Sequence, residues 1–473
     1  MNGVRRPALA AASAWLAAAV GVALVLAVFW PGFMSPDSAE QLDQARSGAW
    51  TSVHPPAMAW SWALTERLLP GPGGLFAVHT VLLWGALAWL ATGLFRNSAA
   101  RVAFVVVLGL APPVLVTSVH LWKDVPMAGF ALLALAALVH AGRCPPGRRR
   151  AVALAIAALA LVLACAWRHN AIALVPPLAW WLAAQAGIAG RWRRLAAAAV
   201  LTAAVAVLAA LPARHPSVAQ RAVWPVTAVW DLAAVSIAED AMRIPPDWRH
   251  PDLDLPTLAA AFTPWSNTSV FDTGQLLISL YNPPDPARHA SLRAAWLAAW
   301  RDSPGAMAGH RLRLSALLFG LVPSARPVGL VLAPAMVQPR LGAPVAMPAN
   351  VLRDRLVGAL AWLAATPAFA LWPYALAALL ATLGRRRRHP LAWPLLASAA
   401  TYCLPLPLLA PSAEFRYLLW PVLACLVALL LPARSASPPD RRPGGILDGQ
   451  GGPGRSEVAG RHGRSSRPTE GDR

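Results

Sequence analysis

The chain carries a small set of polar and charged side chains whose chemistry suits proton transfer beside an anionic group. A carboxylate can take the proton of an attacking hydroxyl group, and lysine or arginine can hold a phosphate and stabilise its charge. The set lies in short segments between long apolar runs: Asp37, Glu40, His54, Lys123, Asp124, Arg168, Asn170, Glu414, Arg416 and Tyr417. If the runs place all of these side chains on one side of a membrane, they can form one site.

Lys123 is the only lysine among the 41 lysine and arginine residues of the chain. It precedes Asp124 between two apolar runs, where charged side chains are costly and therefore indicate a functional site. Either the two residues form a local ion pair, which contributes little to stability, or Asp124 is a second acid of the site and Lys123 holds a phosphate as a compact point charge. Trp122 beside them is expected to anchor the chain at the membrane interface.

Asp37 follows the first apolar run directly. A Ser or Asp followed three residues later by Glu or Gln is a capping signature at a helix start, and Asp37 with Glu40 or Ser38 with Gln41 fits it. The alternative is a general base or a metal ligand at the membrane surface. The two interpretations are compatible, because Ser38 can cap the helix while Asp37 points elsewhere.

The other polar residues also have plain structural interpretations. His54 precedes two prolines that are expected to start an amphipathic helix reaching Leu69, and could simply be a polar residue at a helix start. Arg168 and Asn170 fall in a tight turn and could be solvated there. Glu414 and Arg416 are two residues apart and would not share a helix face, so separate partners are expected for them.

Composition places the chain among membrane proteins. It is 57% hydrophobic and 13% charged, with a mean hydropathy of +0.50, whereas soluble domains are about 25% charged. The net charge of +20 does not indicate nucleic acid, because the arginines cluster in short loops between apolar runs. Four cysteines without metal-ligand spacing are expected to be small buried hydrophobes: Cys144, Cys165, Cys403 and Cys425.

Apolar runs long enough to cross a membrane recur along the sequence, and we expect about ten transmembrane helices. The expected spans are 8–30, 74–95, 102–122, 126–143, 151–167, 171–188, 195–212, 357–383, 391–410 and 417–432. The first run could instead belong to a cleaved signal peptide, but it exceeds the apolar core of about 7–15 residues that such peptides have. We therefore predict an uncleaved first span.

Arginine-rich segments predict the orientation. They lie at 5–6, 96–101, 143–150, 191–194 and 385–388 and in the tail after residue 433. All fall on one side if the ten spans alternate, and the positive-inside rule makes that side cytoplasmic. Both termini are then cytoplasmic, the chain lies in the plasma (inner) membrane, and the candidate site lies on the outer side.

The fold class that follows is an all-α membrane protein with a large outer segment, periplasmic or extracellular. Its expected parts are an N-terminal transmembrane region (1–212) that contains the first outer loop (31–73), the outer segment (213–356), a C-terminal transmembrane region (357–433) and a disordered cytoplasmic tail (434–473).

The outer segment is expected to contain helices near 292–301 and 306–321. Its apolar pieces 314–322 and 328–337 are too short to span a membrane. We therefore interpret them as interfacial or re-entrant.

The order of the polar motifs resembles that of the GT-C-type membrane glycosyltransferases, and within them the bacterial relatives of the protein O-mannosyltransferase and aminoarabinose transferase group. The matching motifs, spread over residues 30–420, are Pro36-Asp37-Ser38, His54-Pro55, Trp122-Lys123-Asp124, Arg168-His169-Asn170 and Glu414-Phe415-Arg416-Tyr417. Each motif is weak alone, and the resemblance rests on their order and their shared outer side.

The resemblance implies a GT-C-like fold and transfer of a sugar from a polyprenyl-phosphate carrier to a lipid, glycan or protein acceptor on the outer face. Asp37 would be the catalytic acid or base and Asp124 a second acid. The carrier phosphate would be bound by Lys123, Arg168 and Arg416. The same cavity would be lined by His54, and Asn170, Glu414 and Tyr417 would complete the substrate-binding set.

One departure from the family pattern concerns a metal cofactor. Many members have two adjacent acids in the first outer loop, whereas Asp37 has no acidic neighbour. Glu40 lies one helical turn away and could substitute for the second acid. No cofactor is certain, and a divalent metal stays an open alternative.

Three other functions fit parts of the pattern. A transporter or flippase of a lipid-linked sugar would also bind phosphate, but it needs polar groups at mid-membrane. The spans here are nearly pure Ala, Leu and Val with polar groups at their outer ends, which favours a one-sided site. A polymerase or ligase of surface polysaccharide is close in chemistry, and a membrane scaffold would leave the outer charges without a purpose.

Overall fold

The computed structural model describes residues 2–271, 274, 285–322, 335–384 and 389–432. Throughout these residues the regular structure is helical, and extended segments form only isolated bridges. The prediction of an all-α protein is therefore confirmed for the described chain. Residues Met1–Ala433 belong to one compact unit. The tail 434–473 and the arginines at 385–388 lie outside the described residues.

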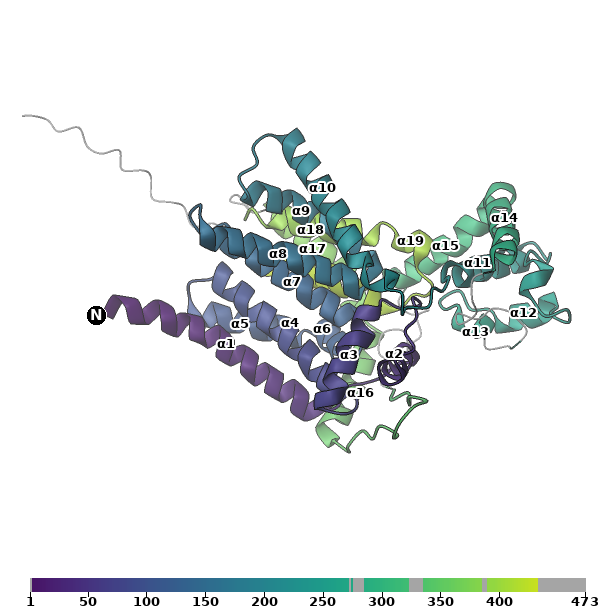
Figure 1. Ribbon diagram of the computed structural model, residues 1–473, viewed down its shortest axis with the longest axis horizontal. Coiled ribbons are helices and arrows are strands. Elements are labelled where there is room, and N and C mark those ends of the chain that lie inside the picture. The colour runs from purple at the N-terminus through teal and green to yellow at the C-terminus, as the bar shows by residue number, and fades with distance from the viewer. Residues whose placement is uncertain (1, 272–273, 275–284, 323–334, 385–388, 433–473) are drawn as a thin grey trace, which may run out of the picture. The chain divides into compact units, whose positions relative to one another are not determined.

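Long apolar helices lie side by side and form a bundle (Figure 1). They are α1 (Asn2–Phe29), α4 (Gly73–Leu94), α7 (Asp124–Ala141), α8 (Arg148–Trp167) and α10 (Arg191–Ala210). Helix α7 lies at the centre, packed against α4 and α8, and most of its residues are buried. Its small residues, such as Ala131 and Ala134, let the neighbouring helices approach closely.

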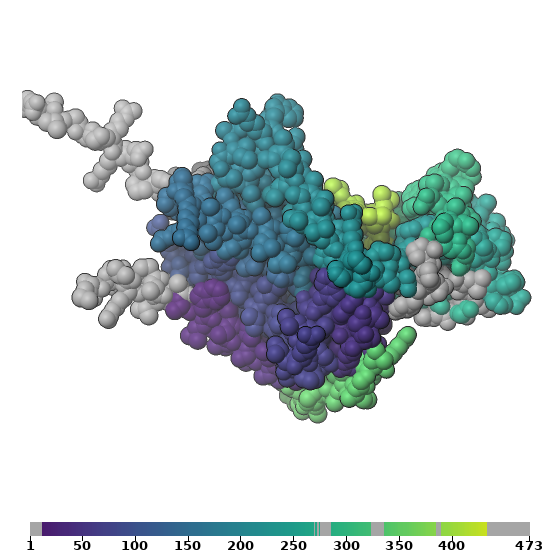
Figure 2. Space-filling model, in the orientation of Figure 1, coloured from purple at the N-terminus to yellow at the C-terminus, as the bar shows by residue number. Residues whose placement is uncertain are grey.

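The outer faces of the bundle are apolar as well as exposed. Helix α10 stands out from the bundle in the space-filling view (Figure 2), and Val200 on it is 70% exposed. Exposed Leu195 and Val207 extend the same apolar surface. Water would disfavour so much exposed apolar surface, whereas lipid tails accommodate it.

Among the described residues, six helices are long and apolar enough to cross a membrane, or up to seven if one bent pair counts as a span. The six are Ala12–Phe29, Gly73–Leu94, Asp124–Ala141, Arg148–Trp167, Arg191–Ala210 and Ala392–Leu409. The last combines α18 (Ala392–Cys403) and α19 (Leu406–Leu409). The described chain is thus a multi-pass membrane protein by length and composition, and the expected count of ten spans stays a prediction.

Proline interrupts some of the other expected spans. The expected span 102–122 is two helices, α5 (Ser98–Leu110) and α6 (Pro112–Ser118), that meet at 61°. Pro112 and Pro113 lack backbone N–H donors and end the preceding helix. Window hydropathy does not detect such a break, because proline does not make the window polar.

Three further expected spans differ from the observed helices. The prediction of 357–383 as one continuous helix was wrong, because the segment is divided at Pro367. The segments expected at 171–188 and 417–432 are continuous but short, and each begins with a 3-10 turn. The observed elements are η1 (His169–Leu174) and α9 (Val175–Gln185) in place of 171–188; α16 (Val351–Ala364), η6 (Pro367–Phe369) and α17 (Trp372–Gly384) in place of 357–383; and η7 (Phe415–Leu418) and α20 (Leu419–Leu430) in place of 417–432.

Arginine-rich connections cluster at the end of the bundle away from the candidate site. Arg101 and Arg143, which belong to different connections, both donate to the carbonyl of Thr92 at the end of α4. Arg150 at the start of α8 donates to the carbonyl of Gln185 at the end of α9. Basic segments that the positive-inside rule assigned to one side therefore meet at shared helix ends.

The opposite end of the bundle carries α2 (Pro36–Ser47) and α3 (Pro56–Leu68) (Figure 1). Helix α2 begins two residues earlier than a cap at Asp37 requires, and three residues earlier than a cap at Ser38 requires. Its N-cap is Ser35, and the Ser38 hydroxyl accepts from the backbone N–H of Ser35 at 3.3 Å. Because Ser35 is the cap, Asp37 lies inside the first turn and its carboxylate is available for other contacts.

The outer segment holds several shorter helices: α11 (Trp224–Ala238), α12 (Leu255–Ala261), α13 (Thr268–Phe271), α14 (Pro286–Asp302) and α15 (Pro304–Leu318), with η2 (Pro212–Arg214) and η3 (Pro246–Trp248). The helices expected near 292–301 and 306–321 correspond to α14 and α15. Most of the apolar piece 328–337 lies outside the described residues. The division of the chain into four parts stays a prediction.

A tryptophan ring fixes how α1, α4 and α5 pack. Trp84 of α4 is 1% exposed, and its ring fills the space beside Gly21 of α1 and Gly109 of α5. A Cβ atom at Gly21 would lie 2.0 Å from the ring, and one at Gly109 would lie 2.5 Å from it. Glycine at these two positions is therefore what lets three helices meet around one buried indole.

Replacement of Gly21 by alanine should destabilise the bundle. The added methyl group requires Trp84 or α1 to move, and overpacking of this kind costs about 1–3 kcal/mol. We expect the Gly21→Ala protein to unfold at a lower temperature in detergent, measured by tryptophan fluorescence. The control is Gly85→Ala in α4, where the nearest atom lies 3.9 Å from the added Cβ. Equal unfolding temperatures for both variants would contradict this packing.

Candidate functional site

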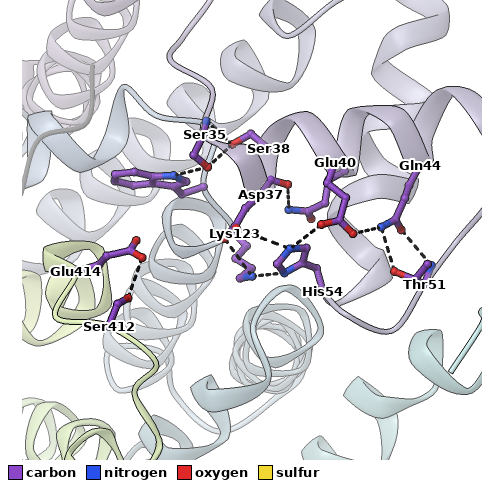
Figure 3. A network of polar contacts seen from close by, with 12 residues as sticks. Ser35, Asp37, Ser38, Glu40, Gln44, Thr51, His54, Lys123, Ser412 and Glu414 are labelled. Atoms are coloured by element: carbon purple, nitrogen blue, oxygen red, sulfur yellow. Dashed lines mark hydrogen bonds and ion pairs between the residues drawn. The ribbon is translucent and has the colours of Figure 1, made fainter. Parts of the chain in front are cut away.

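The polar residues singled out in the sequence converge at the end of the bundle that carries α2 and α3. Figure 3 shows Asp37 and Glu40 of α2 facing His54 and Lys123, with Glu414 and Ser412 nearby. We call the group of Asp37, Glu40, His54, Lys123, Glu414 and Arg416 the acid–base cluster. Its members come from the first outer loop, the start of α7 and the start of η7.

Asp37 lies at the centre of this cluster. One Arg416 nitrogen donates to Asp37 Oδ2 at 2.9 Å, and Lys123 Nζ lies 3.9 Å from the same oxygen. The Asp37 side chain is 32% exposed, against 8% for Arg416 and 14% for Lys123. Asp37 is therefore the member of the three that a substrate can reach most directly.

The electrostatic surroundings keep Asp37 ionised. Burial alone would raise the pKa of this carboxyl, but the nearby charges of Arg416 and Lys123 hold its pKa well below the usual range. The first turn of α2 also favours a negative charge there. A carboxylate held this way binds cations well, but it is a weak proton acceptor while both cations stay on it.

His54 holds Lys123 in place. Lys123 Nζ lies 2.6 Å from His54 Nδ1. A charged ammonium group can only donate, so Nδ1 accepts and the ring proton lies on Nε2. Nε2 in turn lies 3.6 Å from Glu40 and 3.9 Å from Asp37. His54 is therefore a member of the cluster and not merely a polar residue before the helix, which begins only at Pro56.

Burial lowers the pKa of Lys123 to about 8, although the charges of Asp37 and Asp124 oppose this shift. Arg168 and Arg416 nearby also disfavour the ammonium form. Lys123 therefore loses its positive charge near pH 8, well below the pH at which a solvated lysine does so.

Glu40 is fixed from its other side. The amide group of Gln44 donates to Glu40 Oε1 at 3.0 Å, and the same amide also donates to the Thr51 hydroxyl at 3.1 Å. The remaining Glu40 oxygen faces His54. Glu40 thus orients the imidazole ring of His54, which contacts Lys123. This arrangement differs from the family pattern of two adjacent acids, in which Glu40 was expected to take the place of the second acid.

Asp124 pairs with Arg168 across the bundle. The two side chains meet at 2.6 Å, and Asp124 is fully buried in the first turn of α7. Lys123 points instead toward Asp37 and His54. The interpretation of Lys123 and Asp124 as a local ion pair was therefore wrong, because consecutive residues at a helix start project in different directions.

In the turn that contains them, Arg168 is buried and Asn170 is half-buried, so the interpretation of these two side chains as solvated was also wrong. Arg168 is 8% exposed and donates to the Asn170 side-chain oxygen at 2.8 Å. Asn170 donates to the Tyr402 hydroxyl of α18 at 3.2 Å. This turn thus connects the Asp124 pair to the C-terminal helices.

Arg416 pairs with its neighbour Glu414 as well as with Asp37. Separate partners were expected because the spacing does not suit an α-helix. The segment instead leaves an extended residue at Glu414 and enters the 3-10 helix η7, so the two side chains can turn toward each other. Arg416 therefore connects two partly exposed carboxylates, that of Asp37 near the start of the chain and that of Glu414 near its end.

Tyr417 lies beneath both arginines of the site. The guanidinium of Arg168 lies 4.8 Å from the centre of the Tyr417 ring, and that of Arg416 lies 5.5 Å from it. The Tyr417 hydroxyl is 3.1 Å from the Ser412 hydroxyl, which donates to Glu414 at 2.8 Å. The ring therefore supports two cations at once through cation–π contacts.

Three residues that sequence reasoning did not assign to the site contribute to it. Trp122 is buried, donates to the Ser35 hydroxyl at 3.0 Å and lies 5.1 Å from the Arg416 guanidinium, so it does not anchor the chain at the interface as expected. Tyr402 and Ser412 complete the network. Only Trp122 had a signal in the sequence, namely its place beside Lys123.

Within the described residues, no three His, Cys, Asp or Glu side chains are arranged to hold a metal ion. The acids of the cluster already face cations: Asp37 faces Lys123 and Arg416, and Asp124 faces Arg168. These pairings disfavour a divalent metal, because a positive side chain already lies at one oxygen of each carboxylate.

A cavity of about 420 Å³ lies elsewhere, between the end of α1 and the start of α16. Leu26, Trp30, Asn350 and Arg353 contribute to its lining. None of the acid–base cluster lines this cavity, so it is a separate feature of the surface.

The buried pair of Asp124 and Arg168 should matter for stability. Removal of one partner leaves the other charge buried and unpaired, which costs about 3–5 kcal/mol. We expect Arg168→Ala to lower the unfolding temperature strongly, measured in detergent. The control is Arg301→Ala, whose ion pair with Asp302 is exposed on both sides, and which should leave the unfolding temperature unchanged. A similar effect of both variants would contradict a special role for the buried pair.

No family model matches this chain, and no curated protein matches it. Among solved structures, the chain is similar to the crystal structure of ArnT from Cupriavidus metallidurans in the apo state. The match covers 89% of this chain and 78% of that one, at 17% sequence identity and a TM-score of 0.33. A TM-score this low carries no argument about fold or function, so the resemblance of the sequence motifs stays a prediction.

Proposed function

We propose that this protein is an integral-membrane glycosyltransferase that moves a sugar from a polyprenyl-phosphate-linked donor to an acceptor on the outer face of the membrane. The observation that carries the proposal is the acid–base cluster itself. A partly exposed carboxylate, Asp37, lies against Lys123 and Arg416 at one end of an apolar bundle. That combination suits attack of a hydroxyl group on a sugar whose leaving group is a lipid phosphate.

In the proposed reaction, the hydroxyl oxygen of the acceptor attacks the anomeric carbon of the donor sugar. The bond between this carbon and the phosphate oxygen breaks, and the electron pair leaves with the phosphate. Asp37 takes the hydroxyl proton. Lys123 and Arg416 stabilise the negative charge that develops on the leaving phosphate.

Donor binding also changes Asp37 in this mechanism. Lys123 and Arg416 now lie on the Asp37 carboxylate, which keeps its pKa well below the usual range. A phosphate that draws these cations toward itself would leave the carboxylate a stronger base. Asp37 would thus become an effective proton acceptor only when the donor is present.

The remaining members orient these groups. His54 and Glu40 hold the Lys123 ammonium group, and Glu414 keeps Arg416 from turning away when it leaves Asp37. Deeper in the bundle, Arg168 is neutralised by Asp124, so we assign it to support of Tyr417 and Asn170 more than to direct phosphate contact.

We place the site on the outer side of the plasma membrane, with both termini cytoplasmic. This placement is supported by the arginine-rich connections that meet at the opposite end of the bundle. A flippase is less well supported, because the charged cluster lies at one end of the bundle and not along a path through it.

Asp37→Asn should abolish transfer while the protein stays folded. An amide cannot accept the hydroxyl proton, and loss of a general base typically costs about 10²–10⁴-fold in rate. The measurement is release of polyprenyl phosphate from polyprenyl-phosphate-linked hexose and pentose donors by purified protein in lipid.

The matched control for this variant is Asp43→Asn on the same helix. Asp43 accepts from the backbone N–H groups of Arg340 and Leu341 and takes no part in the cluster. Its turnover should stay within a few-fold of the wild type. Unchanged turnover of Asp37→Asn would overturn the assignment of the base.

The pH dependence should report Lys123. As pH rises through about 8, Lys123 loses its proton and with it the attraction for an anionic donor, so kcat/KM should fall on the alkaline side. Arginine keeps its charge far above this pH, so Lys123→Arg should move the fall to higher pH. An alkaline limb at the same pH in both proteins would show that another group titrates.

A further inference from the structure

A second pair of buried charges lies in the outer segment, outside the acid–base cluster. Asp231 of α11 is fully buried, and the Arg311 side chain of α15 is 4% exposed. The two meet at 2.6 Å, and Trp296 of α14 donates to the same Asp231 oxygen at 2.9 Å. Burial of two charges is costly unless their geometry is good. A buried pair of this kind therefore suggests a role beyond stability.

The second amino group of Arg311 reaches a different part of the chain. It donates to the carbonyl of Ala410 at 2.9 Å. Ala410 ends the short helix α19, a few residues before Glu414. Arg311 therefore joins the outer segment to the stretch of chain that leads into the site.

The other side of this stretch is held by the outer segment as well. The backbone N–H of Asn267 donates to Pro411, and that of Ala413 donates to Trp265, on either side of a bridge between Ser266 and Ser412. The stretch 410–413 thus lies between Arg311 and the backbone of 265–267. We call this stretch the clamped segment.

The contacts on both sides of the clamped segment depend on two consecutive residues of α11. Trp230 donates to the carbonyl of Thr263, whose hydroxyl donates to the carbonyl of Ser266. Its neighbour Asp231 holds Arg311. One turn of α11 therefore fixes the clamped segment from both sides.

The clamped segment in turn contacts residues that determine the position of Arg416 in the acid–base cluster. The Ser412 hydroxyl donates to Glu414 at 2.8 Å and contacts Tyr417 at 3.1 Å. Glu414 pairs with Arg416, and Arg416 contacts Asp37. A shift of the clamped segment would therefore move the Arg416 guanidinium relative to Asp37 and Lys123.

We infer that Asp231 and Arg311 are positioning residues, through which the outer segment holds Arg416 in the geometry that binds the donor phosphate. The inference rests on the proposed function for its ligand, a polyprenyl phosphate. Neither residue touches the substrate. Their effect passes through the backbone at Ala410 and the side chains of Ser412 and Glu414.

A double-mutant cycle tests the inference with decaprenyl phosphate as the probe, and binding to purified full-length protein in detergent as the measurement. Lysine at position 311 has one ammonium group and cannot reproduce the fork that joins Asp231 to Ala410. We expect Arg311→Lys to weaken binding about 3- to 10-fold. In a protein that already carries Arg416→Lys, it should have little further effect, because coupled residues are not additive.

A matched control and a second variant guard against general damage to the fold. Arg313→Lys changes an exposed arginine of the same helix and should leave binding unchanged. Asp231→Asn weakens the hold on Arg311 while it keeps an acceptor for Trp296, and it should follow Arg311→Lys. Purely structural damage would instead give effects that add to those of Arg416→Lys, and this additivity would overturn the inference.

A measurement without ligand separates this inference from the proposed function. Hydrogen exchange of the peptides that cover 410–418 should be faster in Arg311→Lys than in the wild type and in Arg313→Lys. If the wild type does not bind decaprenyl phosphate, the proposed function fails. The exchange result still decides whether Arg311 holds the clamped segment in place. Unchanged exchange would overturn the inference.

Discussion

The contact between Arg416 and Asp37 is the interaction on which the rest of the site depends. It joins residues 379 positions apart at 2.9 Å, so the first outer loop and the last helices must dock before the cluster exists. Its surroundings are largely closed to water, which strengthens attraction and also raises the cost of any unpaired charge. Most of the other buried charges at the site therefore lie against an opposite charge.

Pairing of buried charges is the common rule of this end of the molecule. Asp124 has Arg168, Asp231 has Arg311, and Arg416 lies between Asp37 and Glu414. Lys123 is the exception, since it shares Asp37 with Arg416 and its other close contact is the uncharged ring of His54. Burial lowers the pKa of Lys123 and the charge of Asp37 opposes this shift only in part, so Lys123 is the cation of the cluster that an anionic ligand can recruit most easily.

Long apolar segments were predicted well from the sequence, because a membrane helix leaves a strong and local hydropathy signal. The helices α1, α4, α7, α8 and α10 lie close to their expected ranges. The breaks at Pro112 and Pro367 were missed, because proline interrupts backbone hydrogen bonds without a change in the apolar character of the window. Hydropathy reports how apolar a segment is, and it does not report whether the segment forms one unbroken helix.

The sequence by itself determined the class of protein and most of the charged residues that gather at the site, because composition, spacing and position beside apolar runs are local properties. Only the tertiary structure decided the partners: Lys123 contacts His54 and not Asp124, and Arg416 donates to Asp37 and pairs with Glu414. Asp231 and Arg311 carried no signal that linked them to the site. Ion pairs depend on distances between helices that are far apart along the chain, and these distances are set by packing.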